Sequence, residues 1–232
     1  DYKVIVSLEK TGDCSVKGRG NLTGSLAARL RKAAENPRRK KRILESLIKS
    51  EVPRINSGEN RFLNLKQPDN PVIHLFEGRI PGFASQESSN LVFSPFLKDI
   101  TPDSLIGKKY REYEYVLNTP RLERLRADFI LPEGFAWRSI PQKAVIQSRY
   151  GLFVMDLYIK GNMLKVACSF AIPAMRIPPE SYPKFIAFLD EIKEMVKGMV
   201  TVAEFDPPID PEPVESFLHI TIHKSHSKNV MA

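Results

Sequence analysis

GLFVMDLYIKGNMLKVACSF, residues 151–170, is the stretch that decides the fold. Every second residue is apolar on both sides of the turn-forming Lys160-Gly161-Asn162. These positions are Phe153, Met155, Leu157 and Ile159 before the turn, and Leu164, Val166, Cys168 and Phe170 after it. A period of two residues is that of a β-strand with one buried face. The stretch therefore predicts an antiparallel hairpin, central in a sandwich or in a sheet that a helix covers.

Shorter segments of the same kind surround this hairpin. A second hairpin is expected over residues 4–16, and further strands are expected at 62–65, 72–76, 91–96, 113–117, 125–131 and 199–203. Apolar residues instead recur every three or four positions at 25–34, 37–48 and 180–197, as in amphipathic helices. The predicted fold class is α+β: mainly antiparallel β in sandwich-like lobes, with two N-terminal helices and one long C-terminal amphipathic helix.

Polar and proline-rich segments divide the chain. Thr101-Pro102-Asp103-Ser104 offers a short capped helical turn and a boundary between two lobes. We expect residues 1–108 to form an N-terminal β-rich lobe with a helical insertion. Residues 109–204 are expected to form an antiparallel β lobe with a packed helix. Residues 205–232 read as a stiff, acidic, proline-rich linker and a short C-terminal strand.

Composition restricts the class of protein. Of 232 residues 42% are hydrophobic, which is enough to bury a sizeable core. The longest apolar stretches fall short of the ~18 residues that a membrane-crossing helix requires, so no transmembrane segment is expected. Two cysteines are too few for a disulfide scaffold. Because neither an initiator Met nor a leader stands at Asp1, we expect the chain to be a fragment or a processed product.

The strongest charge feature lies in the two N-terminal helices. The net charge is +8, and the densest group of cations comprises Arg29, Arg31, Lys32, Arg38, Arg39, Lys40, Lys41 and Arg42. The last five are consecutive and lie near the positive end of the second helix, where cations are unfavourable. This group is the candidate binding site, for an anionic polymer or a membrane surface. The alternatives are a solvated surface and pairing with the acidic residues after Glu204.

Three motifs follow one another in the second half of the chain. They are Leu131-Pro132-Glu133-Gly134-Phe135, Ser148-Arg149-Tyr150-Gly151 and RIPPESYPKF at 176–185. Their order resembles the C-terminal, non-catalytic part of exported bacterial transglutaminase-like proteins, in which a β domain, a transglutaminase-like core and a C-terminal β-rich domain follow one another. The resemblance implies an extracytoplasmic accessory domain without a cofactor, which positions substrate or mediates assembly. Its partners would be other domains of its parent or another protein.

Gly12-Asp13-Cys14 is similar to the sequence that leads into the catalytic cysteine of that family. The family's cysteine begins a helix, whose dipole stabilises the thiolate, whereas Gly18 and Gly20 follow Cys14 and favour a turn. His74 lies in an apolar, strand-like run without a catalytic motif. We therefore expect no catalytic residue here, the alternative being a Cys-dependent amidase or transglutaminase fragment that uses Cys14. Cys168 is in phase with buried residues, which favours a free thiol over a disulfide with Cys14.

His219, His223 and His226 invite a metal site near the C-terminus. Apolar residues alternate with polar ones over 218–223, which predicts a strand. At ~3.3 Å per residue, His219 and His223 would lie about 13 Å apart, too far to share an ion. We expect no metal site.

Trp137, with Phe135 and Tyr150, could stack on a base or a sugar. The interleaved arginines of a nucleic-acid platform are missing around them. We therefore expect these rings to pack in the core, and no specific nucleic acid as a partner.

Overall fold

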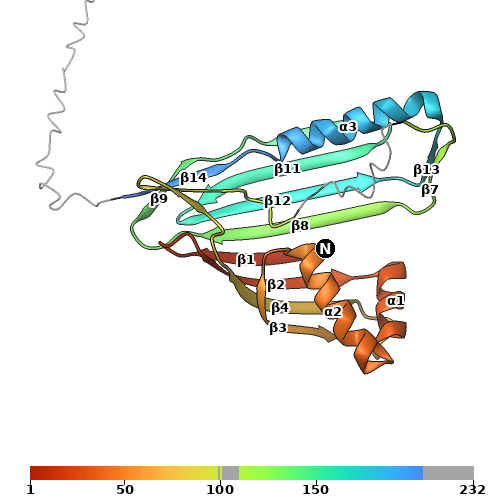
Figure 1. The fold of residues 1–232 in the computed structure, drawn as a ribbon, viewed down its shortest axis with the longest axis horizontal. Coiled ribbons are helices and arrows are strands. Elements are labelled where there is room, and N and C mark those ends of the chain that lie inside the picture. Colours follow the sequence, from red (N-terminus) through yellow and green to blue (C-terminus); the bar gives the residue numbers. More distant parts are fainter. Residues whose placement is uncertain (99, 101–109, 206–232) are drawn as a thin grey trace, which may run out of the picture.

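The structure is a computed structural model and describes residues 1–98, 100 and 110–205. Eight strands form the main sheet: β1 (Tyr2–Leu8), β2 (Cys14–Leu22), β3 (Asn56–Leu63), β4 (Val72–Ile80), β8 (Arg121–Ile130), β10 (Ala144–Ser148), β11 (Gly151–Lys160) and β12 (Met163–Ile172). Their order is β10-β11-β12-β8-β1-β2-β4-β3 (Figure 1). Neighbours run antiparallel except β1 and β8, which are parallel.

The hairpin predicted over residues 151–170 is confirmed. β11 and β12 pair from Leu152 and Ala171 to Lys160 and Met163. Gly161 in the turn has a φ of 61°, a conformation that glycine adopts without steric cost. Both strands are internal to the sheet, as the apolar alternation predicts.

Two smaller sheets complete the β structure. One contains β5 (Ser85–Glu87), β6 (Asn90–Phe93), β14 (Val200–Glu204) and β9 (Phe135–Ser139), in that order, and the other pairs β7 (Tyr115–Leu117) with β13 (Met175–Ile177). The four-stranded sheet packs on the main sheet through Phe93, whose ring centroid lies 5.5 Å from that of Phe129 on β8. This half of the molecule is therefore sandwich-like.

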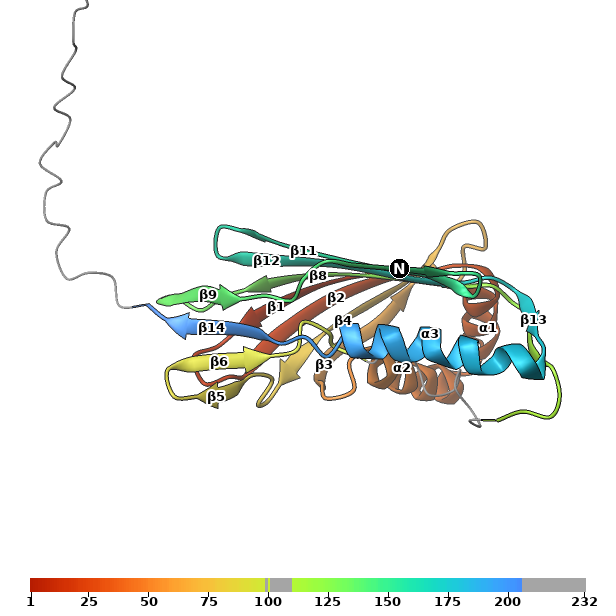
Figure 2. The ribbon, with the colours of Figure 1, turned by 90° about the horizontal axis from the view of Figure 1, so that it is seen from above.

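The helices cover the rest of the same side. They are α1 (Gly24–Ala34), α2 (Pro37–Glu51) and α3 (Tyr182–Met195), the last preceded by the 3-10 turn η2 (Pro179–Ser181). The buried face of α3 consists of Tyr182, Phe185, Phe188, Leu189 and Ile192. Figure 2 shows α2, α3 and the four-stranded sheet on one side of the main sheet. The α+β class with two N-terminal helices and one long C-terminal helix is confirmed.

The main sheet crosses the boundary predicted near residue 108. β1 pairs with β8 from Tyr2 opposite Leu125 to Ser7 opposite Ile130. Buried side chains from both predicted lobes form one continuous core. The predicted turn at 101–104, and the linker and strand predicted beyond residue 205, lie outside the described residues.

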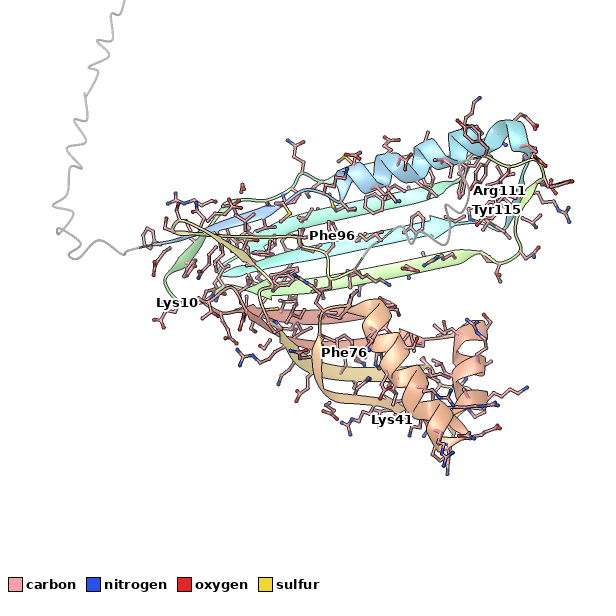
Figure 3. All side chains as sticks on the ribbon, viewed as in Figure 1. Lys10, Lys41, Phe76, Phe96, Arg111 and Tyr115 are labelled. Atoms are coloured by element: carbon pink, nitrogen blue, oxygen red, sulfur yellow. The ribbon has the colours of Figure 1, made fainter. Side chains whose placement is uncertain are left out.

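The glycines after Cys14 lie in a strand, so the expectation of a turn there is wrong. Gly18 and Gly20 belong to β2, and aromatic rings occupy the space beside them. A Cβ at Gly18 would lie 2.0 Å from Cζ of Phe76, and one at Gly20 would lie 2.4 Å from Cε1 of Tyr2. Figure 3 shows Phe76 beside α2. The glycines are thus needed for close packing of the rings, rather than for a turn.

Candidate functional site

The predicted basic site lies on α1 and α2, which form a helical hairpin beside β3 and β4 (Figure 1). On α1, Arg29 and Lys32 are exposed. On α2, the cations are Arg38, Arg39, Lys41 and Arg42, all exposed, and the partly buried Lys40. The side chains of these seven residues make no ion pair or hydrogen bond with any other described residue. The structure thus gathers them at one end of the helical hairpin, where the two helices join.

The N-terminal end of α2 carries the positive end of the helix dipole, and no acidic side chain lies in its first turn. Asn36 is the cap, and its side-chain oxygen accepts from the backbone N–H groups of Arg38 (3.0 Å) and Arg39 (3.2 Å). Pro37 is the first helical residue, as predicted. The first turn carries no acidic residue. Cations beside a helix N-terminus are unfavourable by ~0.3–1 kcal/mol each, so a bound anion would stabilise this end.

Arg31 differs from the other predicted cations. Its guanidinium donates to the backbone carbonyls of Gln67 (2.9 Å) and Asn70 (2.5 Å), in the loop between β3 and β4. This contact fixes the loop against α1. Arg31 therefore has a structural role and is not free to bind a ligand.

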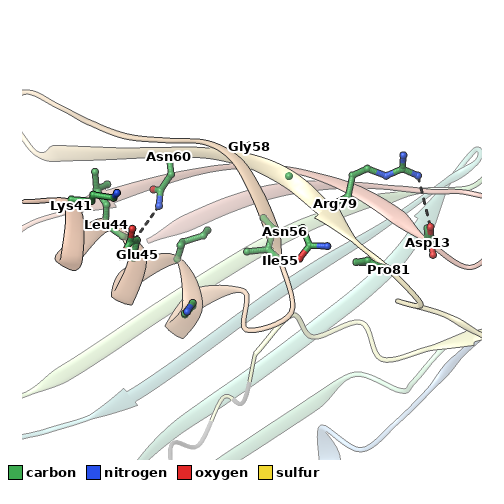
Figure 4. Close-up of a pocket in the computed structure, with 13 residues that line it drawn as sticks. Asp13, Lys41, Leu44, Glu45, Ile55, Asn56, Gly58, Asn60, Arg79 and Pro81 are labelled. Carbon is green, nitrogen blue, oxygen red and sulfur yellow. Dashed lines mark hydrogen bonds and ion pairs between the residues drawn. The ribbon is translucent and has the colours of Figure 1, made fainter.

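A separate groove runs between α2 and the strands β3 and β4 (Figure 4). Its volume is about 1210 Å³. Lys41, Glu45 and Lys49 line the helical side, and Arg79 lies on the opposite side, where it pairs with Asp13 at 3.8 Å. Charges of both signs therefore line the groove. Among the predicted cations, the described lining contains Lys41 alone.

A buried polar chain links α2 to β1 beneath this groove. Asn60 donates from Nδ2 to the backbone carbonyl of Leu44 (3.1 Å), so its Oδ1 accepts from His74 Nε2 (2.8 Å). His74 Nδ1 then accepts from the hydroxyl of Tyr2 (3.1 Å). Burial lowers the pKa of His74 to about 4, and its side chain is 0% exposed. His74 is therefore a neutral core histidine without access to a substrate in solution.

Cys14 lies buried at the start of β2, opposite Ile80 on β4. Burial raises the pKa of its thiol to about 12, despite a backbone hydrogen bond with Ile80 that lowers it. His74 is opposite Gly20 in the same strand pair. Six residues of strand, about 20 Å, therefore separate Cys14 from His74. The structure does not bring the two together.

Cys168 is a buried free thiol, as predicted. Burial raises its pKa to about 12. It is opposite Leu125, which pairs with Tyr2 at one end of β1, whereas Cys14 is opposite Leu8 at the other end. The two thiols are therefore displaced by about 20 Å along the strands and by three strand spacings across the sheet, well beyond the ~4.4–6.8 Å between the Cα atoms of a disulfide.

The predicted aromatic group does not form a stacking surface. Phe135 and Trp137 lie on β9 and pack against the core. Tyr150 is buried elsewhere, and its hydroxyl donates to the carbonyl of Ser181 (3.0 Å). The prediction of core packing is confirmed.

The predicted histidine triplet, His219, His223 and His226, lies outside the described residues. Within residues 1–98, 100 and 110–205, no group of three or more His, Cys, Asp or Glu side chains is placed to hold a metal ion. No helix in these ranges is both long and apolar enough to cross a membrane.

Sequence reasoning missed a buried ion cluster between α2, β8 and the segment after β6. Lys98 pairs with Glu51 (2.8 Å) and Glu123 (3.2 Å), and Arg121 also pairs with Glu123. Burial raises the pKa of Glu123, but Lys98 and Arg121 together lower it by more, so the pKa lies below its usual value. Glu51 and Glu123 are far apart in the sequence, so no local pattern indicates this cluster.

A second missed feature does have a sequence signal. Lys3, Arg19, Arg124 and Arg126 occupy alternate, outward-facing positions of three neighbouring strands. The two-residue period around each of them places it on the face opposite the core.

Comparison with known proteins gives one family match. Residues 89–200, slightly less than half of the chain, match the family described as a domain of unknown function with a solved structure (DUF3858). The match begins just before β6 and ends in β14, so β1 to β4 and the basic helices precede it. It is compatible with a transglutaminase-like context.

One solved structure is similar to part of the chain, whereas no curated protein matches it. The crystal structure of a suspected protease from Parabacteroides distasonis aligns with 50% of this chain at 15% identity and a TM-score of 0.42. The aligned part covers 24% of that chain. The search of the curated proteins found no match.

Proposed function

We propose that this chain is a non-catalytic accessory domain of a larger, exported transglutaminase-like protein, in which it positions substrate or mediates assembly. The observation that carries the proposal is the burial and the raised pKa of both cysteine thiols. Cys14 and Cys168 are buried, with thiol pKa values near 12, and about 20 Å separates Cys14 from His74. Acyl transfer by cysteine needs a thiolate and a base within hydrogen-bond reach. The described residues offer a β scaffold that does not place Cys14 within reach of His74.

The reactivity of Cys14 tests the proposal. In a Cys168→Ser variant, Cys14 is the single thiol, and its alkylation by iodoacetamide at pH 7 is followed by mass spectrometry. We expect the folded chain to react slower than the same chain in urea by a factor on the order of 10³, because a pKa raised from 9.0 to about 12 lowers the thiolate fraction at pH 7 by that factor. The matched control is Cys14→Ser, in which Cys168 reacts and should be protected similarly. Folded Cys14 that reacts faster than free cysteine would contradict the proposal.

A second candidate function is binding of an anionic surface through α1 and α2. The observation in its favour is the positive end of α2, with its uncompensated cations from Arg38 to Arg42. An Arg38→Glu/Arg39→Glu variant should lose affinity for vesicles that contain anionic lipid. Binding by the unmodified chain should weaken steeply with added salt, as counterion release requires. Equal binding by both chains would dismiss this candidate.

A further inference from the structure

One face of the main sheet is left uncovered by the described chain. We call it the open face: the side chains of β1, β2, β4, β8, β10, β11 and β12 that alternate with the buried ones. α2, α3 and the four-stranded sheet all lie on the opposite side (Figure 2). Several large apolar side chains are exposed on it, namely Ile5, Leu122, Val145, Leu152 and Tyr158. The open face thus carries apolar surface that the described chain does not bury.

Four cations stand side by side at the centre of the open face. Arg126 on β8 is opposite Lys3 on β1, and Lys3 is opposite Arg19 on β2. Arg124 precedes Arg126 by two residues on the same face. Opposed residues lie ~5 Å apart and residues two apart on a strand lie ~7 Å apart, measured between Cα atoms. We call these four residues the cationic strip.

The cationic strip is electrically uncompensated within the described chain. All four side chains are exposed, and none makes an ion pair or hydrogen bond with a described residue. Flanking cations of the same face are paired: Lys165 with Asp128 (3.2 Å), and Lys17 with Glu77 (3.6 Å). Like charges placed directly across a sheet destabilise it. Carboxylates of a bound partner would remove this repulsion.

Two shallow hollows lie on either side of the cationic strip. The first, of about 330 Å³, is lined by Ile5, Leu75 and two of the strip cations, and also by Lys17, Glu59 and Glu77. The second, of about 210 Å³, is lined by Val154, Ala167, Ser169 and the other two strip cations, and also by Asp156. A complementary surface would therefore present carboxylates between apolar side chains.

We propose that the open face is the docking surface for an acidic protein partner that also contributes apolar side chains. The inference rests on the proposed function, because it names the surface by which an accessory domain engages its partner. A second copy of this chain does not fit, since its identical cations would face the same strip. A polyanion or an anionic membrane fits poorly, because a partner that offers only negative charge would leave the apolar side chains of both hollows uncovered.

Two synthetic peptides test the proposal with the full chain. One is a labelled 15-residue polyglutamate, and the other has leucine at every third position. Although it carries less charge, the leucine-containing peptide should bind the chain at least about threefold more tightly, because it also buries apolar surface. Fluorescence anisotropy measures both affinities.

Charge-reversal variants locate the binding. Arg124→Glu/Arg126→Glu should weaken binding of the leucine-containing peptide by about tenfold or more. Lys3→Glu/Arg19→Glu is an independent variant of the same strip and should behave alike. The matched control is Arg38→Glu/Arg39→Glu on α2, which changes net charge equally and should keep the affinity within about twofold. Circular dichroism confirms that each variant is folded.

Several results would overturn the docking proposal. One is that neither peptide binds at millimolar concentration, and another is that the strip and α2 variants lose equal affinity for the leucine-containing peptide. The proposal would also be wrong if polyglutamate or heparin bound more tightly than the leucine-containing peptide. It would be wrong, too, if the chain formed a dimer that the strip variants dissociate. Glutamine-to-amine transfer is measured on the same samples. If the chain transfers the amine and the two peptides bind in the expected order, the non-catalytic function alone is refuted. If the chain is inactive and binds neither peptide, the docking surface alone is refuted.

Discussion

Replacing Lys98 by methionine tests whether the buried ion cluster holds the end of α2 against β8. The side chains of Lys98, Glu51 and Glu123 are 17%, 14% and 29% exposed. At their separations of 2.8 and 3.2 Å, each attraction is worth ~5–6 kcal/mol at an effective dielectric constant of ~20, before the opposing desolvation. In Lys98→Met, Glu51 loses its cation, whereas Glu123 keeps Arg121. We therefore expect a loss of about 3 kcal/mol in the free energy of unfolding at pH 7.

Urea denaturation provides the assay, with the fluorescence of Trp137, the single tryptophan, as the probe. The control is Lys197→Met, which removes an ion pair to Glu194 whose two side chains are 67% and 68% exposed. That variant should change stability by less than about 0.5 kcal/mol. A loss below 0.5 kcal/mol in Lys98→Met at pH 7, indistinguishable from the control, would refute the reasoning.

The pH dependence of this loss gives a second check. In the native cluster the pKa of Glu123 is below its usual value of 4.5, so its contribution to stability is present above pH 4.5 and disappears as the pH falls through the folded value. Without Lys98, the burial of Glu123 favours its protonated carboxyl group. The difference between the native chain and Lys98→Met should therefore shrink between pH 7 and pH 4.

Three further predictions concern packing and titration in the core. Gly18→Ala should destabilise the chain by about 1–3 kcal/mol because its Cβ would meet an aromatic ring at 2.0 Å, whereas Gly58→Ala, with its nearest neighbour at 3.7 Å, should be near neutral in urea melts. The pKa of His74 is about 4 in the folded chain, against its usual value of 6.5. Neutral His74 should therefore contribute on the order of 3 kcal/mol of stability, which is complete above pH 6.5 and is lost as the pH falls toward 4. In His74→Phe, the dependence of stability on pH over this range should become flat. Phe185→Ala should cost about 3–5 kcal/mol of unfolding free energy and Lys184→Ala almost nothing, and equal losses would contradict the assigned buried face of α3.

The elements with a local period were predictable from the sequence. The hairpin of β11 and β12 follows from strict alternation around Gly161, and α2 follows from Asn36, Pro37 and a regular apolar stripe. The parallel pairing of β1 with β8 was not predictable, because Tyr2 and Leu125 are distant in the sequence. The local sequence of a hydrophobic strand does not indicate which other strand it will pair with.

The glycines of β2 show how tertiary packing overrides local preference. Gly18 and Gly20 favour a turn when read locally, but Phe76 and Tyr2 fill the volume that side chains would otherwise occupy. Such a contact depends on residues from other strands and has no counterpart in local sequence.

The candidate site was partly predictable. The density of cations on α1 and α2 is visible in the sequence, whereas the contact of Arg31 with the loop between β3 and β4 depends on the fold. The cationic strip was predictable only in part. The outward position of Lys3 and of Arg126 follows from alternation, but their adjacency requires the pairing of β1 with β8.

Transfer of a labelled amine to a glutamine-containing peptide tests the central claim, that the chain itself is non-catalytic, most directly. The purified chain is incubated with both substrates beside its Cys14→Ser variant, and incorporated label is measured over time. Because Cys14 has a thiol pKa near 12 and lies about 20 Å from His74, we predict that neither sample incorporates label above the protein-free background. Incorporation by the unmodified chain and not by Cys14→Ser would contradict the account.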